Sequence, residues 1–314
     1  EGFSGDIVCT PATRDIAEIV LRDAARLQEE DVAFKQKRHR REGRSSPYPY
    51  EPLYTVADVE RTMRRFRTAP YGKPVEVADG VAAEFYEAGH IFGSAFLRVA
   101  MAASTGAPRT ILFSGDMGRA GLPIQRDPAP AVEADVVQVE STYGNRLHPT
   151  RGEARQELRD VVRETARKRG KVIIPSFAVG RTQELVYALN QLEADGDIPS
   201  LPVFVDSPLA VNATEVFRLH PEEWDEEVAE FLRDENRRNP FDAPHVEYVR
   251  DVVRSKRLNY MKESAVIISA NGMAENGRIL HHLKNNIEEP ENTILFVSFQ
   301  AENTLGRRIA SGAR

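Results

Sequence analysis

Residues 171–176 read KVIIPS, and this apolar run opens the stretch of sequence that decides the fold. Apolar, β-branched runs alternate with amphipathic segments from there to residue 298. Strands separated by helices predict a parallel, Rossmann-like sheet with crossover helices. We expect strands at 171–176, 201–207, 264–270 and 292–298, and helices at 182–196, 213–220 and 277–287.

The ends of these expected strands carry a repeated chemistry. Each offers a serine, and three lead through glycine towards an arginine, the last being Arg307. Ligands of open α/β sheets bind beyond the carboxyl ends of the strands, where hydroxyls, helix N-termini and guanidinium groups suit phosphate oxygens. Serines also commonly close strands, which leaves a structural role open. We expect phosphate contacts from Ser176, Arg181, Ser207, Ser269, Arg278 and Ser298.

A nucleotide cofactor is disfavoured at these strand ends. The dinucleotide fingerprint Gly-x-Gly-x-x-Gly follows none of the four, and GMAENG at 272–277 has glycines only at its two ends.

The first half of the chain is richer in expected strands. A long helix is expected over 13–34 and a shorter one over 55–66, with Thr55 as its N-cap. Residues 74–89 alternate around Asp79-Gly80, which predicts a hairpin. Further strands are expected at 6–10, 94–103, 109–115 and 134–142, and a helix over 150–170 that ends on Gly170.

A basic segment follows the first expected helix. Residues 35–52 read KQKRHRREGRSSPYPYEP. The simpler interpretation is a solvated helix end and loop, and the alternative is an arm that touches a nucleic-acid backbone.

Composition sets the class of protein. With 41% hydrophobic and 29% charged residues, the chain is typical of globular domains, and its net charge of −6 means that nucleic-acid contacts must come from local patches. One cysteine excludes a disulfide framework, and no apolar run has the length of a membrane helix, so we expect a cytoplasmic protein without a membrane partner. The chain begins at Glu1 beside a strand-like segment and stops within a helical pattern, which we interpret as a fragment of a longer protein.

Two side chains that bind metals leave strand ends beside glycines. They are His90 in EAGHIFGSA and Asp116 in LFSGDMGR. A lone histidine at an apolar strand end is more often a hydrogen-bonded core residue, but the pair together suggests one shared site.

These two motifs resemble those of a known family, and so do five further stretches: VQVESTYGNRLH, PSFAVGRTQELVYALN, VFVDSPLA, SANGMAENGRILHHLKNN and SFQAENTLGRR. It is that of metallo-β-lactamase-fold ribonucleases with the β-CASP insertion, the bacterial and archaeal relatives of the pre-mRNA 3′-end cleavage endonuclease. The resemblance runs over nearly the whole chain and is weakest near residues 35–50. It implies an α/β fold: a partial metallo-β-lactamase αββα sandwich in residues 1–145 and an inserted Rossmann-like parallel β-CASP domain in residues 146–314.

The resemblance also implies site residues and a cofactor. His90 would be a zinc ligand, and Asp116 a catalytic carboxylate that bridges two Zn²⁺ ions. Glu140 would be a catalytic residue beside the metals that supports a histidine thought to protonate the leaving group. The activity would be hydrolysis of RNA phosphodiesters by hydroxide bound to the two zinc ions. The six strand-end residues would contact the phosphates of single-stranded RNA. A homodimer is one of the oligomeric states that the sequence allows.

The other histidines receive lesser roles. His148, His281 and His282 fall in family-like stretches and are interpreted as secondary, and His220 and His245 as surface residues.

The family's main zinc motif, His-x-His-x-Asp-His, is absent from the sequence, and so are two later histidine motifs. We therefore expect this chain alone to be inactive and to bind zinc poorly, and its parent to be a zinc-dependent ribonuclease. The alternative is a non-catalytic RNA-binding or scaffold paralogue of the same fold. A hydrolase of thioesters or lactams is a weaker alternative, because such enzymes lack the second domain.

Overall fold

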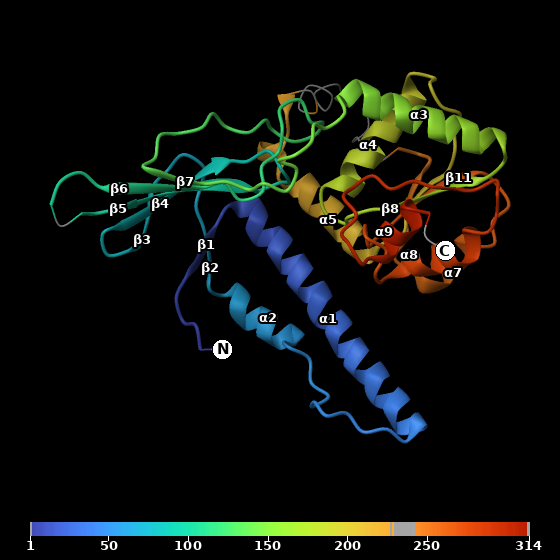
Figure 1. Ribbon diagram of the computed structural model, residues 1–314, viewed down its shortest axis with the longest axis horizontal. Helices are drawn as coiled ribbons and strands as arrows, with labels where there is room; N and C mark the ends of the chain where they lie inside the picture. The colour runs from blue at the N-terminus through green and yellow to red at the C-terminus, as the bar shows by residue number, and fades with distance from the viewer. Residues whose placement is uncertain (1, 104, 227, 229–240, 242, 313–314) are drawn as a thin grey trace. The chain divides into compact units, whose positions relative to one another are not determined.

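The computed structural model describes residues 2–103, 105–226, 228, 241 and 243–312 (Figure 1). It divides into two compact units that interleave along the chain. The first contains Glu1–Ala88, Gly93–Asp116 and Ala129–Val139, and the second contains Gly89–Phe92, Met117–Pro128 and Glu140–Arg314. The domain boundary between residues 145 and 146 stays a prediction.

The second unit is built on the expected parallel sheet. Its strands are β8 (Lys171–Pro175), β9 (Val203–Val205), β10 (Val246–Tyr248), β11 (Ala265–Ser269) and β12 (Thr293–Ile294). They lie in the order β10-β9-β11-β8-β12, and every neighbouring pair is parallel. All residues of β8 and β11 are buried, as strands covered on both faces require. The prediction of a Rossmann-like parallel sheet is confirmed.

Helices connect these strands and flank the first and last of them. They are α3 (Arg151–Arg167), α4 (Arg181–Ala194), α5 (Pro208–Leu219), the 3₁₀ turn η1 (Pro221–Glu223), α7 (Val252–Leu258), α8 (Arg278–Asn286) and α9 (Leu305–Ala310). Ile279 and Leu283 of α8 pack on Ile173 of β8. Leu258 at the end of α7 packs on Phe204 and Ile267. Ile173, Ile267 and Phe204 are register partners in neighbouring strands, so α7 and α8 cover the same face of the sheet.

The end of α3 differs from the prediction of a glycine cap. Arg169, at φ 60°, is the residue in the left-handed conformation, and Gly170 follows it. A Cβ on Gly170 would lie 1.8 Å from the carbonyl oxygen of Glu291. Glycine is needed there because two backbone segments approach closely, and not because of its φ angle.

The first unit contains a second sheet, ordered β3-β4-β5-β6-β7. Its strands are β3 (Val75–Ala78), β4 (Val81–Glu87), β5 (Ala95–Met101), β6 (Arg109–Phe113) and β7 (Val136–Gln138). Pairing is antiparallel from β3 to β6, and β7 is parallel to β6. The predicted hairpin is confirmed, with Ala78 opposite Val81 and Gly80 at φ 68°. A separate parallel pair joins β1 (Ile7–Cys9) to β2 (Phe66–Thr68).

The helices α1 (Pro11–Glu42) and α2 (Val56–Met63) complete this unit. Ala25 of α1 packs on Val59 and Met63 of α2. The capping box at Thr55 confirms the predicted start of α2. In the described part of the chain, no helix combines the length and apolar character needed to cross a membrane.

The basic segment is helical where we expected a helix end and a loop. The helix α1 continues to Glu42 and ends at Gly43 in the left-handed conformation (Figure 1). Lysine, glutamine and arginine are good helix formers, and cations in the last turn of a helix interact favourably with its dipole. These local preferences extend the helix eight residues beyond the predicted 13–34.

Candidate functional site

The backbone of His90 is held by a buried glutamine. Nε2 of Gln125 donates to the carbonyl oxygens of Gly89 and His90, at 2.6 and 3.1 Å. Gln125 is 5% exposed, whereas the imidazole-bearing residue His90 is exposed. The sequence analysis missed Gln125, because it lies in an irregular segment without a motif.

Glycines bring a second segment against His90. A Cβ on Gly118 would lie 1.6 Å from the carbonyl oxygen of Gly89 and 2.8 Å from the backbone nitrogen of His90. Only glycine allows this approach, as the paired Gly-rich motifs suggested. Asp116, an exposed residue, precedes Gly118 by two positions.

Glu140 secures the backbone next to Asp116. Its Oε1 accepts a 2.6 Å hydrogen bond from the backbone N–H of Met117, and its Oε2 accepts one of 2.8 Å from the hydroxyl of Thr142. The carboxylate therefore positions the loop that begins at Met117.

The described residues do not by themselves fit a zinc centre. Among them, no three His, Cys, Asp or Glu side chains lie close enough together to hold one metal ion. A catalytic zinc usually takes about three protein ligands. His90 and Asp116 could contribute ligands only to a set that includes residues beyond those described.

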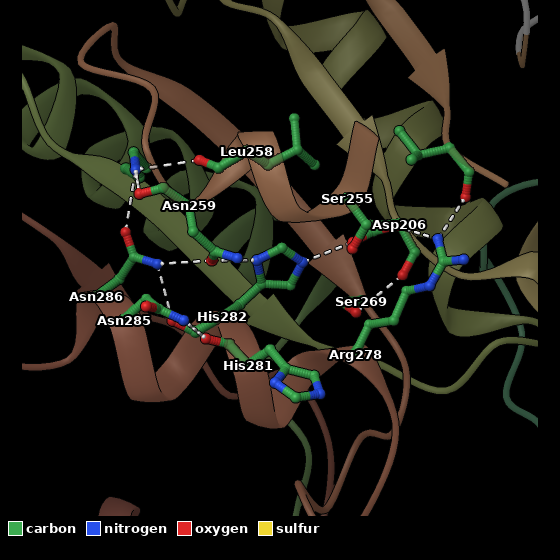
Figure 2. A network of polar contacts seen from close by, with 12 residues as sticks. Asp206, Ser255, Leu258, Asn259, Ser269, Arg278, His281, His282, Asn285 and Asn286 are labelled. Carbon is green, nitrogen blue, oxygen red and sulfur yellow. Dashed lines mark hydrogen bonds and ion pairs between the residues drawn. The ribbon is translucent and has the colours of Figure 1, made fainter. Parts of the chain in front are cut away.

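A buried polar network begins at the carboxyl ends of the parallel strands (Figure 2). Asp206, which follows β9, is fully buried. Its Oδ1 lies 2.6 Å from Nη1 of Arg278. Its Oδ2 accepts a 2.5 Å hydrogen bond from the hydroxyl of Ser255 and lies 2.7 Å from Nε2 of His282. This carboxylate joins the end of β9 to α7 and α8.

The network continues through His282, which is also fully buried. Its Nδ1 lies 2.9 Å from Oδ1 of Asn259, to which Asn286 donates at 3.2 Å. The ammonium of Lys171 donates to the carbonyl oxygens of Leu258 and Asn259 and, at 3.0 Å, to Oδ1 of Asn286. Figure 2 shows His282, Asn259 and Asn286 meeting in this network, and Lys171 reaches it from the first residue of β8.

Two ionisable groups of the network have shifted pKa values. Burial acts to raise the pKa of Asp206, but hydrogen bonds from His282, Ser255 and Arg278 outweigh it, and the pKa lies below its ordinary value. For Lys171, burial first and the nearby charge of Lys262 second lower the pKa of the ammonium. Asp206 is therefore held as a carboxylate inside the unit.

The four strand-end serines lie in different environments. Ser176 and Ser269 are fully buried, and their hydroxyls donate to the carbonyl oxygens of Phe177 and Asp206. Ser207 caps α5 by accepting from the N–H of Ala210. The buried Oγ of Ser298 has no hydrogen-bond partner within the described structure.

The two arginines differ as well. Arg278 uses Nη1 for Asp206 and Val249 and Nη2 for the carbonyl oxygen of Arg250 at 2.6 Å. Arg181 begins α4 with its side chain 42% exposed, and Nη1 pairs with Glu184 at 2.5 Å. The exposed guanidinium of Arg181 is thus the more accessible to a ligand.

Aromatic side chains also gather in this unit. The ring of Tyr143 packs edge-on against His148 at 4.5 Å and Phe299 at 5.9 Å between centroids. The guanidinium of Arg146 lies 5.6 Å from the Tyr143 ring centroid. His148, interpreted as secondary, belongs to this cluster.

The interpretation of two other histidines was wrong. His220 is 7% exposed, and its Nδ1 lies 2.7 Å from Glu222. The side chain of His245 is 15% exposed and its Nδ1 lies 2.5 Å from Glu193. Both histidines gain acidic partners and lie against the fold, whereas His281 is exposed.

Comparison with known proteins agrees with the fold. Residues 182–309 match the Beta-Casp domain model. The chain is 33% identical to Ribonuclease TTHA0252 of Thermus thermophilus, over 98% of this chain and 64% of that protein. It is 30% identical to the RNase J-like protein of Methanocaldococcus jannaschii, over 98% of this chain and 65% of that protein. The chain is 30% identical to transcription termination factor FttA of Methanosarcina mazei, over 99% of this chain and 46% of that protein.

The fold and the matched region define a protein with a β-CASP domain. Over nearly its whole length the chain is similar to proteins named as ribonucleases, in line with the family that its motifs resemble. It spans about half to two thirds of the length of these relatives.

The close approach at Gly118 predicts a large steric effect. Gly118→Ala should lower the free energy of unfolding by about 2 kcal/mol or more, because the added Cβ cannot fit without moving the Gly89–His90 backbone. Urea unfolding measures this. Gly152→Ala is the matched control, since a Cβ there meets nothing within 4 Å. Equal effects of the two substitutions would contradict the close approach.

The buried carboxylate predicts a pH-dependent stability. Asp206→Asn should lower the free energy of unfolding at pH 7 by about 3 kcal/mol, because the cation of Arg278 loses its charged partner. The depressed pKa of Asp206 means that the stabilisation is fully present above about pH 4 and is lost as the pH falls through the folded-state pKa. The difference in the free energy of unfolding between the native chain and Asp206→Asn should therefore become smaller below about pH 4.

Asp251→Asn is the control for this comparison. Asp251 caps α7 through the N–H of Arg254 at 2.8 Å, and asparagine caps a helix about equally well. A constant difference between native chain and Asp206→Asn from neutral to acidic pH would refute the role given to the carboxylate.

Proposed function

We propose that the protein is a zinc-dependent ribonuclease that hydrolyses phosphodiesters of single-stranded RNA. The observation that carries the proposal is the relationship over 98% of the chain to Ribonuclease TTHA0252. The motif residues support it, because backbone contacts of Gly118, Gln125 and Glu140 fix the segments that carry His90 and Asp116.

Zinc enters the proposal through the donor types. Imidazole and carboxylate are ligands that suit zinc, and a carboxylate can bridge two ions. His90 and Asp116 are the proposed contributors, and Glu140 is proposed to position the Asp116 loop beside them. The rest of the ligand set for two Zn²⁺ ions has to come from residues beyond the described ones.

We further propose that the strand-end residues guide RNA. Arg181 is the leading candidate because its guanidinium is exposed, and the unpartnered hydroxyl of Ser298 supports a polar ligand near β12. Ser207, Arg278 and the buried Ser176 and Ser269 already serve the fold, so a phosphate contact from them needs the strand ends to open. A cytoplasmic location is part of the proposal, supported by a single cysteine, Cys9, which is buried and reduced.

A non-catalytic RNA-binding or scaffold role is the second candidate. It requires no zinc ligands, and the described residues contain no group of three that could hold a metal ion. In both proposed functions the protein binds RNA. Only the ribonuclease would also bind zinc and cleave the RNA.

The metal assignment is tested at Asp116. In a form of the protein that carries the full ligand set, Asp116→Ala should abolish RNA cleavage and release at least one zinc ion, since less negative charge then separates two cations. Zinc content and cleavage are measured on the same preparation, with Asp127→Ala as a control carboxylate in the same segment. Near-normal cleavage with two retained zinc ions would refute the assignment of Asp116 as bridge, and cleavage-free native protein would favour the scaffold role.

The RNA contact is tested at Arg181. Arg181→Ala should raise KM several-fold while kcat changes by less than about twofold, because a phosphate contact away from the reacting atoms acts equally on substrate and transition state. Arg61→Ala removes an even more exposed arginine that also pairs three residues away along its helix. A large fall in kcat with unchanged KM would instead place Arg181 at the scissile phosphate.

A further inference from the structure

The end of α1 extends past the packed part of its unit. The last buried side chain in this helix is Ala25, and the helix continues to Glu42. Residues 26–42 therefore form a stretch of about 25 Å without a buried side chain. Figure 1 shows this end of α1 reaching beyond α2. An isolated helix of this length is only marginally stable in water, and most helices owe their stability to packing. Because residues 26–42 bury no side chain, packing of side chains does not explain the length of α1.

The far end of this helix is strongly basic. Within residues 35–44, which we name the basic arm, Glu42 is the only acidic residue, although the whole chain has a net charge of −6. The cations of the basic arm are Lys35, Lys37, Arg38, Arg40, Arg41 and Arg44.

Most of these cations have no acidic partner. Glu42 lies 4.0 Å from Arg38 and 3.4 Å from Arg44. In the part of the chain that the structure describes, no ion pair involves the other four, which are all exposed: Lys35, Lys37, Arg40 and Arg41.

The helix dipole explains only part of this pattern. A cation is favourable within the last turn, which here holds His39, Arg40 and Arg41. Lys37 lies one turn earlier and faces Arg40 and Arg41 at helical spacings of three and four residues. Like charges at these spacings are destabilising, and a polyanion bound along the helix would remove their repulsion.

The basic arm is also held in place. Nδ1 of His39 lies 2.7 Å from the hydroxyl of Tyr50, and the two rings meet edge-on. The N–H of Leu53 donates to Oε1 of Gln28 at 3.0 Å. These contacts fasten the returning segment to α1, so the backbone that carries the cations is already ordered and only their side chains lose freedom when a ligand binds.

We propose that the basic arm binds the phosphate backbone of RNA, outside the strand-end and metal-site residues. The charge complementarity of the unpaired cations with phosphates carries the inference, and the choice of RNA among polyanions rests on the proposed function. Such contacts read no bases, so the basic arm adds affinity equally for different sequences.

The test compares RNA binding of two variants of the 314-residue chain with equal changes in net charge. The arm variant carries Lys35→Gln, Lys37→Gln, Arg40→Gln and Arg41→Gln. The control variant carries Lys256→Gln, Arg257→Gln, Lys262→Gln and Lys284→Gln, all exposed positions of the second unit. Fluorescence anisotropy with labelled oligouridine and oligoadenosine of about 20 nucleotides gives the affinity at about 50 to 200 mM salt.

The arm variant should bind both oligonucleotides at least about tenfold more weakly at about 100 mM salt, with a salt slope smaller by about 0.7 for each lost contact. The control variant should stay within about twofold of the native chain. A charge-retaining variant, with Lys35→Arg, Lys37→Arg, Arg40→Lys and Arg41→Lys, should keep native affinity. Circular dichroism checks that α1 persists, and glutamine is a good helix former.

Equal losses in the arm and control variants would overturn the proposal, because they would reflect overall charge. No RNA binding by the native chain would overturn it too, and would redirect the basic arm to an acidic protein. Loss of binding only in the arm variant would support the basic arm, and it would do so even if a form of the protein that carries the full zinc-ligand set failed to cleave RNA, a result that would refute the proposed hydrolysis alone.

Discussion

Asp206 brings a carboxylate into the interior of the parallel-sheet unit, where an unpaired charge costs several kcal/mol. Three side chains compensate this charge, and two further hydrogen bonds hold the backbone of Asp206. Its backbone N–H donates to Ile268 at 2.8 Å, and its carbonyl oxygen accepts from Ser269. Its side chain binds α7 through Ser255 and α8 through Arg278 and His282. These contacts fix the short strand β9 to β11 and to two helices. The carboxyl ends of β9 and β11 are therefore positioned by the hydrogen bonds of Asp206.

The same constraint separates residues that maintain the fold from residues left for chemistry. Ser269 and Arg278 are engaged around Asp206, whereas Arg181 keeps an exposed guanidinium. His90 and Asp116 are exposed on segments whose backbones depend on glycine contacts and on hydrogen bonds from the side chains of Gln125 and Glu140. Segments of this kind can vary in chemistry because a rigid sheet elsewhere carries the stability.

Sequence reasoning predicted the parallel sheet, the hairpin and the family, because periodicity and short motifs are local signals. It missed the partnership of Asp206 with His282, since 76 positions separate the two residues and nothing local links them. Ser207 was predicted as a site residue because a serine stands at every strand end. The preceding residue, Asp206, makes the hydrogen bonds that join the strand to α7 and α8. The roles of His90, Asp116 and Glu140 remain predictions from the family motifs.

The most direct measurement of the central claim is a double-mutant cycle between Asp206 and Arg278. The free energy of unfolding is measured by urea denaturation for the native chain, Asp206→Asn, Arg278→Gln and the double variant. Because the two side chains lie 2.6 Å apart and one of them is fully buried, we predict a coupling energy of at least about 1 kcal/mol. Effects that add to within about 0.5 kcal/mol would show that the pair does not act as a unit and would contradict the account.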